Sequence, residues 1–327
     1  MTERFASHLL DGKVNLKDLL PDELVEFFRL LGEPAFRARQ VIRWIYVRGV
    51  ARFEDMSDLS RPLRQRLDEV AVLPELQVKA ARHSEQDTTK YLFRLPDGDV
   101  VESVRMRYLE HLGPGRIAIC ISTQVGCAMA CDFCASGKLG LRRNLATWEI
   151  VDQVLQIQKD VAPRGERVAN VVYMGIGEPL HNYQNTMRSV RLVNLAEGLG
   201  IGMRHLTIST AGLVPKIREL AGEGLPVRLA ISLHATDDEL REKLMPVNRK
   251  WKLQELIGAC RDYQQATGRR VTFEYVMLDG VNDSLEQAHR LGALLEGLHA
   301  LVNLIPWNPI EGVPYRRSRP ARIRAFQ

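Results

Sequence analysis

The chain has few cysteines and no long apolar segment. Only five of its 327 residues are cysteine, and most of these are clustered, which suits a reducing compartment and argues against a disulfide framework. No apolar run approaches the length needed to cross a bilayer. The first eight residues mix acidic and basic side chains and lack the apolar region of a signal peptide. The sequence therefore predicts a cytoplasmic protein outside the membrane.

The composition also excludes a disordered chain, because hydrophobic residues make up 45% of it and the charges are mixed. A chain of this length can bury a large core, and one barrel domain with a small accessory domain fits it. The net charge is +5. Basic residues gather in groups that could contact the phosphates of nucleic acid or could simply be solvated surface. These groups are Arg37, Arg39 and Arg43; Lys138, Arg142 and Arg143; Arg249, Lys250 and Lys252; and Arg316, Arg317, Arg319, Arg322 and Arg324.

Cys127, Cys131 and Cys134 lie within eight residues of one another. An iron–sulfur cube normally takes four thiolates, so a cube held by three would leave one iron open to a substrate or cofactor. Phe133 would give the last thiolate apolar cover. The spacing resembles that of the radical S-adenosylmethionine (SAM) enzymes. Zinc is the alternative, but no fourth Cys or His follows Cys134 at a short, regular spacing.

The N-terminal part predicts a helical module with a basic face, followed by two strands that a turn at Pro96 joins. The apolar spacing indicates helices over residues 22–31, 34–46 and 60–70, and strands over 89–95 and 100–106. We expect residues 1–88 to form a helical accessory domain that binds RNA, and residues 89–115 to form a β-hairpin extension.

From Arg116 onward, short apolar strands alternate with helices, which predicts a parallel sheet with right-handed crossovers. We expect residues 116–327 to form a core of the α/β class, a partial (β/α)6 TIM-type barrel, because polar residues collect at successive strand ends. No dinucleotide fingerprint follows the first strand. The predicted strands are 117–123, 170–175, 205–210, 227–234, 271–278 and 301–306, and the predicted helices are 147–161, 182–199, 214–223, 252–267 and 284–298. Residues 318–327 read as the opening turns of a further helix, so we expect a C-terminal piece to be missing.

Side chains alternate between the two faces of a strand. In the first core strand this parity puts Cys120 in the barrel lumen, where a thiol could act catalytically or be a small core residue. Cys260 falls on one helix face with Leu253 and Leu256, which indicates core packing. Glu102 shares a hairpin face with apolar residues; it could have a raised pKa suited to acid–base work, or it could be a surface glutamate.

The same parity puts polar groups near the carboxyl ends of the core strands, where barrel active sites form. Ser209, Ser232 and His234 are predicted to face the lumen. Glu178, in the loop after the second strand, could accept hydrogen bonds from an ammonium group. Asn308, after the sixth strand, could bond a ribose or an adenine.

Several stretches together resemble the RlmN-type methyltransferases, radical SAM enzymes that methylate C2 of adenosine in RNA. The resemblance runs from the hairpin to the tail, and the N-terminal module is also similar. It is carried by Gln124-Val-Gly-Cys-Ala-Met-Ala-Cys-Asp-Phe-Cys, Arg143-Asn-Leu, Tyr173-Met-Gly-Ile-Gly-Glu-Pro-Leu-His-Asn-Tyr, Ile231-Ser-Leu-His-Ala and Leu304-Ile-Pro-Trp-Asn-Pro.

The resemblance implies a role for each matching residue. Cys127, Cys131 and Cys134 would bind a 4Fe–4S cluster. Cys120 would help release the methylated base, forming a disulfide with a second cysteine, and Glu102 would be the proton acceptor. The implied SAM site is Gly177, Glu178, Ser209, Ser232, Leu233, His234 and Asn308.

The implied substrates are adenosine 2503 of 23S rRNA and adenosine 37 of certain tRNAs. In the family one SAM methylates a C-terminal cysteine, and a second SAM generates a radical that activates the new methyl group. The methyl-carrying cysteine matches none of the five in this chain, so we expect the sequence as given to bind cluster and SAM without completing methylation. A flavodoxin-like electron donor and a monomeric state are also expected. Methylation at C8, as in the Cfr-type enzymes, and a non-catalytic RNA-binding protein with a structural cluster are the alternatives.

Overall fold

The computed structural model describes residues 2–85, 87–107 and 116–327. The chain forms two compact units. Unit 1 comprises Met1–Ile121, Leu145–Val171 and Gln184–Gly202, and unit 2 comprises Ser122–Asn144, Val172–Tyr183 and Met203–Gln327. In the described ranges no helix has both the length and the apolar character that a membrane span requires.

Unit 1 begins with the predicted helical module. Its helices α1 (Pro21–Leu30), α2 (Phe36–Tyr46) and α3 (Arg61–Val70) match the three expected ranges to within two residues at each end. Phe27 and Phe28 on α1 are fully buried and pack ring edge to ring face at 5.5 Å. Three short strands, β1 (Leu9–Leu10), β2 (Lys13–Asn15) and β3 (Ala71–Val72), form a small sheet beside them.

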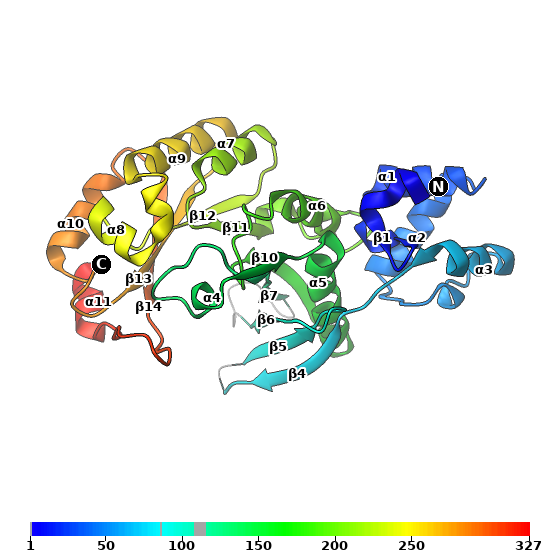
Figure 1. The fold of residues 1–327 in the computed structure, drawn as a ribbon, viewed down its shortest axis with the longest axis horizontal. Coiled ribbons are helices and arrows are strands. Elements are labelled where there is room, and N and C mark those ends of the chain that lie inside the picture. Colours follow the sequence, from blue (N-terminus) through cyan, green and yellow to red (C-terminus); the bar gives the residue numbers. More distant parts are fainter. Residues whose placement is uncertain (1, 86, 108–115) are drawn as a thin grey trace. The chain divides into compact units, whose positions relative to one another are not determined.

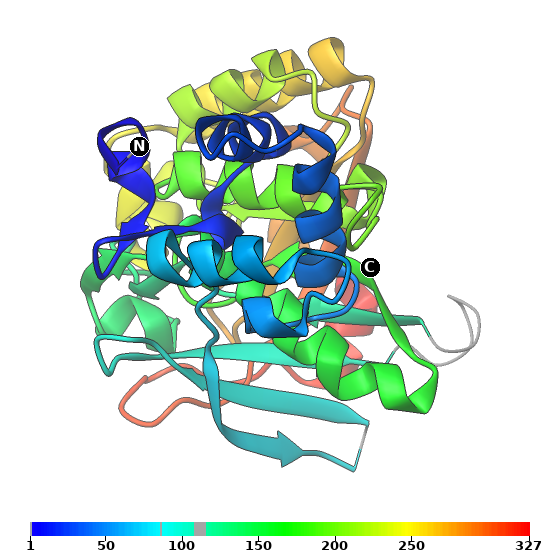
Figure 2. The same ribbon diagram turned by 90° about the vertical axis from the view of Figure 1, so that its right-hand side faces the viewer.

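The predicted hairpin is present in unit 1 and carries one strand more than expected. Strands β5 (Thr88–Arg94) and β6 (Val100–Met106) pair antiparallel, β4 (Gln77–His83) adds to β5, and β7 (Arg116–Cys120) adds to β6. Figure 2 shows the neighbouring strands β4 and β5 in cyan. Residues 108–115, which the predicted extension included, lie outside the described residues.

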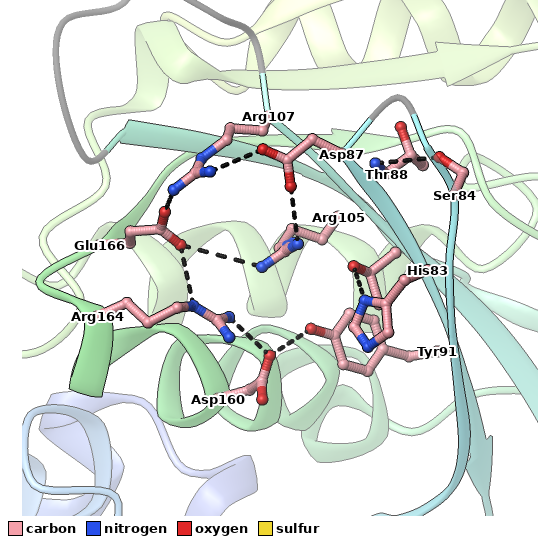
Figure 3. A network of polar contacts seen from close by, with 11 residues as sticks. His83, Ser84, Asp87, Thr88, Tyr91, Arg105, Arg107, Asp160, Arg164 and Glu166 are labelled. Carbon is pink, nitrogen blue, oxygen red and sulfur yellow. Dashed lines mark hydrogen bonds and ion pairs between the residues drawn. The ribbon is translucent and has the colours of Figure 1, made fainter.

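One face of this sheet is buried and the other is open. Tyr91, Phe93 and Val101 are at most 3% exposed, and Ser103 on the same face donates a hydrogen bond to Gln153 of α5 (Thr147–Val161) at 2.7 Å. At the edge of the buried face, Arg105, Arg107 and Arg164 alternate with acidic side chains (Figure 3). Each of these three arginines therefore has a carboxylate partner.

All six predicted core strands are observed. β7 and most of β10 (Arg167–Tyr173) belong to unit 1. The other four belong to unit 2 and pair in parallel in chain order: β11 (Leu206–Thr210), β12 (Arg228–Ser232), β13 (Val271–Met277) and β14 (Ala300–Pro306).

Helices separate these strands as predicted. α5 has the expected bounds, whereas α6 (Tyr183–Asn194) stops five residues before the expected end because a turn and two glycines follow it. In unit 2, α7 (Val214–Gly222) lies beside α9 (Leu253–Thr267) (Figure 1). α10 (Leu285–Leu294) and α11 (Pro320–Phe326) complete the expected set.

Among the α-helices and β-strands of unit 2, four were not predicted. α8 (Asp238–Leu244) follows β12, and the two-stranded sheet of β8 (Gln124–Gly126) and β9 (Leu141–Asn144) flanks the cysteine loop, which also contains the short helix α4 (Ala135–Lys138). These elements surround the carboxyl ends of the unit 2 strands and shape the site described next.

Candidate active site

The three clustered cysteines lie in the loop between β8 and β9. The Cys127 amide donates to the Gly140 carbonyl at 3.0 Å, and the Cys134 amide donates to the Cys131 carbonyl at 3.1 Å. Gly126 precedes the loop with φ of 74°, and a Cβ there would stand 1.7 Å from the Gly140 oxygen. The close approach of the two backbone segments therefore requires glycine at this position.

Three side-chain and backbone contacts fix the loop to the rest of unit 2. The Asp132 amide donates to the Leu244 carbonyl at 2.9 Å, and the Trp307 indole donates to the Phe133 carbonyl at 3.1 Å. The Tyr315 hydroxyl donates to the Asp132 carboxylate at 2.6 Å. These bonds hold the cysteine loop in place without using its thiols.

A cavity of about 300 Å3 opens between the cysteine loop and the strand ends of unit 2. It brings together most of the predicted site, including all three cysteines, from four separate segments of the chain. Its lining comprises Cys127, Met129, Cys131, Phe133, Cys134, Tyr173, Met174, Gly175, Gly177, Glu178, Pro179, Ser209, Thr210, Ala211, Ser232, His234, Met245, Glu274, Val276 and Ile305.

Glu178 is a carboxylate in the cavity wall and is only 3% exposed. It accepts hydrogen bonds from the amides of Ala211 at 2.7 Å and Leu180 at 3.1 Å, and from the Thr210 hydroxyl. Burial nevertheless raises its pKa to about 7. Because a carboxylate has about four acceptor positions, Glu178 retains capacity for one donor from a ligand.

His234 is a neutral hydrogen-bond donor in the same cavity. Burial and the nearby Arg241 lower its pKa to about 3. Its Nδ1 lies 3.0 Å from the Val276 amide and accepts that hydrogen, so the proton of the neutral ring is on Nε2. Phe133 packs edge to face against the imidazole with centroids 4.9 Å apart. The ring is therefore held on two sides, with Nε2 free to donate.

Arg241 on α8 supports the strand ends from behind and was missed by the sequence analysis. Its guanidinium is fully buried and donates to three carbonyls, those of Ala211 at 2.7 Å, Ser232 at 3.0 Å and Leu233 at 3.1 Å. Two of these residues, Ala211 and Ser232, line the cavity. The residue type alone gave no signal, because α8 itself was not predicted.

The donor set fits a four-iron cluster better than a single ion. Burial raises the pKa of Cys127 to about 11 and also raises the pKa of Cys131, so these thiols keep their protons at neutral pH unless a metal binds them. In the described part of the chain, no three His, Cys, Asp or Glu side chains are grouped for one metal ion. A cube holds its thiolates farther apart than one ion does, because each thiolate binds a different iron atom.

Two residues of the predicted cofactor site lie outside the cavity lining. Leu233 is fully buried, and its backbone amide and carbonyl are already bonded to the Glu274 carbonyl and to Arg241. Asn308 is exposed in the segment after β14. Gly177, by contrast, lines the cavity with φ of 106°, and a Cβ there would stand 2.6 Å from the Gln124 side chain.

Cys120 and Glu102, the two predicted catalytic residues, share the open face of the unit 1 sheet. Cys120 lies opposite Val104 in the β6–β7 register, and Glu102 is two residues from Val104 along β6. They are therefore diagonal neighbours on one face. Of the two alternatives for Glu102, this open face agrees with a surface glutamate; its carboxylate pairs with Lys90 at 3.0 Å. Cys260 is fully buried on α9, as predicted.

Comparisons with known proteins agree with this geometry. A family model described as "Ribosomal RNA large subunit methyltransferase N-terminal domain" matches residues 14–73, and one described as "Radical SAM superfamily" matches residues 121–292. The superfamily match confirms the predicted 4Fe–4S cluster and SAM as cofactors.

Curated relatives match almost the whole chain. A probable dual-specificity RNA methyltransferase RlmN from Symbiobacterium thermophilum is 50% identical over 97% of this chain and 84% of its own length. The dual-specificity RNA methyltransferase RlmN from Syntrophobacter fumaroxidans is 46% identical over 96% and 90%.

A solved structure, a radical SAM methyltransferase from Sphaerobacter thermophilus, is 45% identical, has a TM-score of 0.90 and covers 95% of this chain and 90% of its own. This likeness confirms the predicted partial barrel. The chain belongs to the RlmN family of radical SAM RNA methyltransferases.

Proposed function

We propose that the protein methylates C2 of adenosine in RNA, with adenosine 2503 of 23S rRNA and adenosine 37 of certain tRNAs as substrates. The relatives named above are called dual-specificity RNA methyltransferases, which supports two RNA substrates. The observation that carries the proposal is the cavity of unit 2, where three half-buried thiols share the lining with the Glu178 carboxylate, the hydroxyls of Ser209 and Ser232, and the His234 imidazole.

In this proposal each part of the cavity has one task. Cys127, Cys131 and Cys134 hold the cluster, which when bound supplies the electron for reductive cleavage of SAM. Glu178 accepts a hydrogen bond from the α-ammonium of SAM, and Nε2 of His234 donates to an acceptor on it. The remaining polar residues of the predicted set position the cofactor: Gly177, Ser209, Ser232, Leu233 and Asn308. A flavodoxin-like protein delivers the electron, and the enzyme acts as a monomer.

The methyl group reaches the base through a methylated cysteine, which in this proposal is none of the five in the sequence. Cys260 is unsuited to that role because it is buried in α9, where burial raises its pKa to about 12. Cys120 is the thiol that resolves the protein–RNA adduct, and Glu102 accepts the proton from C2. Their diagonal placement on one open face supports a joint action on the base.

Anaerobic reconstitution with iron, sulfide, SAM, a reductant and unmodified 23S rRNA tests the proposal. Digested RNA is analysed by mass spectrometry for methylated adenosines, and 5′-deoxyadenosine is measured in parallel. Formation of 2-methyladenosine would support the C2 reaction, whereas 8-methyladenosine would replace it with the C8 reaction; either product would overturn the inference that the methyl-carrying cysteine is none of these five cysteines. A protein that carries iron but forms no 5′-deoxyadenosine would overturn the proposal in favour of a non-catalytic RNA-binding protein. Cleavage of SAM without methylated base would show that these five cysteines do not complete the transfer.

A further inference from the structure

The open face of the unit 1 sheet carries a straight row of residues across four strands. Arg82 on β4 lies opposite Lys90 on β5, Lys90 lies opposite Val104 on β6, and Val104 lies opposite Cys120 on β7. Directly opposed residues point to the same face. With strands about 4.8 Å apart, Arg82 is about 14 Å from Cys120 along this row. The row therefore joins a cationic edge to the predicted catalytic thiol.

Of the three basic residues Arg82, Lys90 and Arg94 on this open face, only Lys90 has an acidic partner among the described residues. Arg82 and Lys90 are both exposed and directly opposed, an arrangement of like charges that destabilises a sheet. Lys90 pairs with Glu102. Among the described residues, Arg82 and Arg94 have no acidic partner. Arg94 lies four residues after Lys90 on β5, so its side chain points to the same face as that of Lys90.

The other side of the same sheet shows the opposite arrangement. Arg105 and Arg107 bind Asp87 and Glu166, and Arg164 binds Asp160 and Glu166 (Figure 3). His83, which follows Arg82 on β4, contacts the Thr89 hydroxyl at 2.9 Å on this side. Three arginines here meet three carboxylates. Arg82 and Arg94, which lack an acidic partner among the described residues, thus lie on the face of this sheet that carries Cys120.

Each of three basic groups that the sequence points to, on α2, around Arg249 and in the C-terminal segment, has at least one member with an acidic partner. Arg39 of α2 binds Glu197 at 3.6 Å, and Arg249 and Lys252 both bind Glu242, at 3.2 and 2.9 Å. Arg316 lies 3.5 Å from Asp279. These groups consequently offer less free charge to an anion than their composition suggests.

From these observations we propose that the open face is a docking surface for single-stranded RNA, with Arg82, Lys90 and Arg94 contacting the phosphates that flank the target nucleotide. The unpaired cations complement a polyanion, and the row ends at the thiol where the base is expected to react. An unpaired stretch fits because its bases can turn away from the backbone. The inference rests on the proposed function and adds the place where the RNA backbone lies.

The test removes two free cations and measures RNA affinity. The double variant Arg82→Ala/Arg94→Ala is compared with the parent protein for binding to a single-stranded loop of the 23S substrate at several salt concentrations. We expect Kd to rise about tenfold at low salt, and the slope of log Kd against log salt to fall by about 1.4, since each phosphate contact to a single strand contributes about 0.7.

A matched control separates this site from a general effect of charge. Arg228 and Arg270 are exposed and stand at the amino ends of β12 and β13, so Arg228→Ala/Arg270→Ala removes the same charge elsewhere. Binding close to that of the parent is expected for this control. An equal loss in both double variants would overturn the proposal, and so would unchanged binding in the first.

The result that would reject the proposed function differs from the result that would reject the docking surface. Formation of 5′-deoxyadenosine without RNA should be the same in the parent and in both double variants, because none of the four arginines lines the cavity. A parent protein that binds no RNA would reject the RNA methyltransferase function itself. A parent that binds RNA while Arg82→Ala/Arg94→Ala binds equally well would reject only the docking surface.

Discussion

Glu178 combines full burial with three hydrogen-bond donors, and burial is the stronger influence because the pKa rises to about 7. In the unfolded chain the carboxyl has its ordinary pKa near 4.5, so between pH 4.5 and 7 the folded protein keeps a proton that the unfolded chain releases. Stability must then fall as the pH rises through this window. The same carboxylate is the one we expect to meet the ammonium group of SAM.

This linkage gives a pH-dependent prediction. Relative to Glu178→Gln, the cluster-free protein should lose about 3 kcal/mol of unfolding free energy between pH 4.5 and 7, and little more above pH 7. Urea unfolding of both proteins at half-unit steps of pH measures the difference and cancels the contributions of the other carboxyls. Parallel stability profiles would show that the pKa of Glu178 is not raised.

Gly177, next to Glu178 in the cavity lining, has a backbone conformation that only glycine adopts readily. Its φ of 106° and the 2.6 Å approach of a Cβ to Gln124 both oppose any side chain. We expect Gly177→Ala to weaken SAM binding at least tenfold in equilibrium dialysis, since Gln124 must move and its side chain also accepts the Glu178 amide at 2.8 Å. The control Gly258→Ala, in α9 with open space around its Cβ, should bind SAM normally and be no less stable.

At the scale of elements, α8 connects the cavity to the body of unit 2 through Arg241. Four carbonyl or amide oxygens accept from its guanidinium, including Asn248 Oδ1 at 3.0 Å. Removing the guanidinium takes one hydrogen bond from each of these acceptors, and although Leu233 keeps the bond from the Ala235 amide, each buried acceptor left unpaired costs about 1–3 kcal/mol. The cost does not depend on a bound cofactor, because the bonds are made within the protein.

We therefore expect Arg241→Met to destabilise the protein by about 3–5 kcal/mol in denaturant unfolding. The exposed Arg218, which pairs with Asp262 at 2.9 Å, provides the comparison, and Arg218→Met should cost less than about 1 kcal/mol. Near-equal losses in the two variants would contradict the assignment of Arg241 as the support of the strand ends.

Periodic apolar elements were predictable from the sequence, and mostly polar ones were not. α5 has an apolar face along its whole length and was predicted with its observed bounds. β4 was missed because all seven of its residues are exposed, so no alternation marks it as a strand. α8 was missed because its seven residues include five charged ones, and only the burial of Arg241 and Leu244 shows its inner face.

In the candidate site, too, local patterns predicted some residues, and others depended on tertiary contacts. Strand parity placed Ser209, Ser232 and His234 in one cavity, since it depends only on alternation along a chain. The contributions of Met245 and Glu274 to the lining, and the unpaired charge of Arg82, depend on which strands and helices become neighbours. That pairing is a tertiary property which no local pattern records.

At the scale of the whole molecule, the cysteine loop belongs to unit 2 and is held there mainly by contacts that do not involve its thiols. Its backbone is held by Leu244, Trp307 and Tyr315, and Phe133 and Met129 pack against the core cluster around Met245 and Val276. The fold of unit 2 should therefore survive loss of the cluster, while a bound cluster adds its binding free energy to the stability of the folded state.

Iron removal tests this separation. Chelation under reducing conditions should lower the thermal midpoint by about 5–10 °C, which corresponds to about 3 kcal/mol for a unit of this size, and should raise hydrogen exchange mainly in residues 122–144.

Cys131→Ala should bind less iron than the parent and should unfold like the chelated protein, whereas Cys260→Ser should retain its iron because that thiol is buried in α9. Exchange that rises equally throughout β11 to β14 would mean that the cluster is needed to fold the unit. Exchange confined to the loop would mean that the cavity wall of Glu178 and His234 is formed before the cluster arrives.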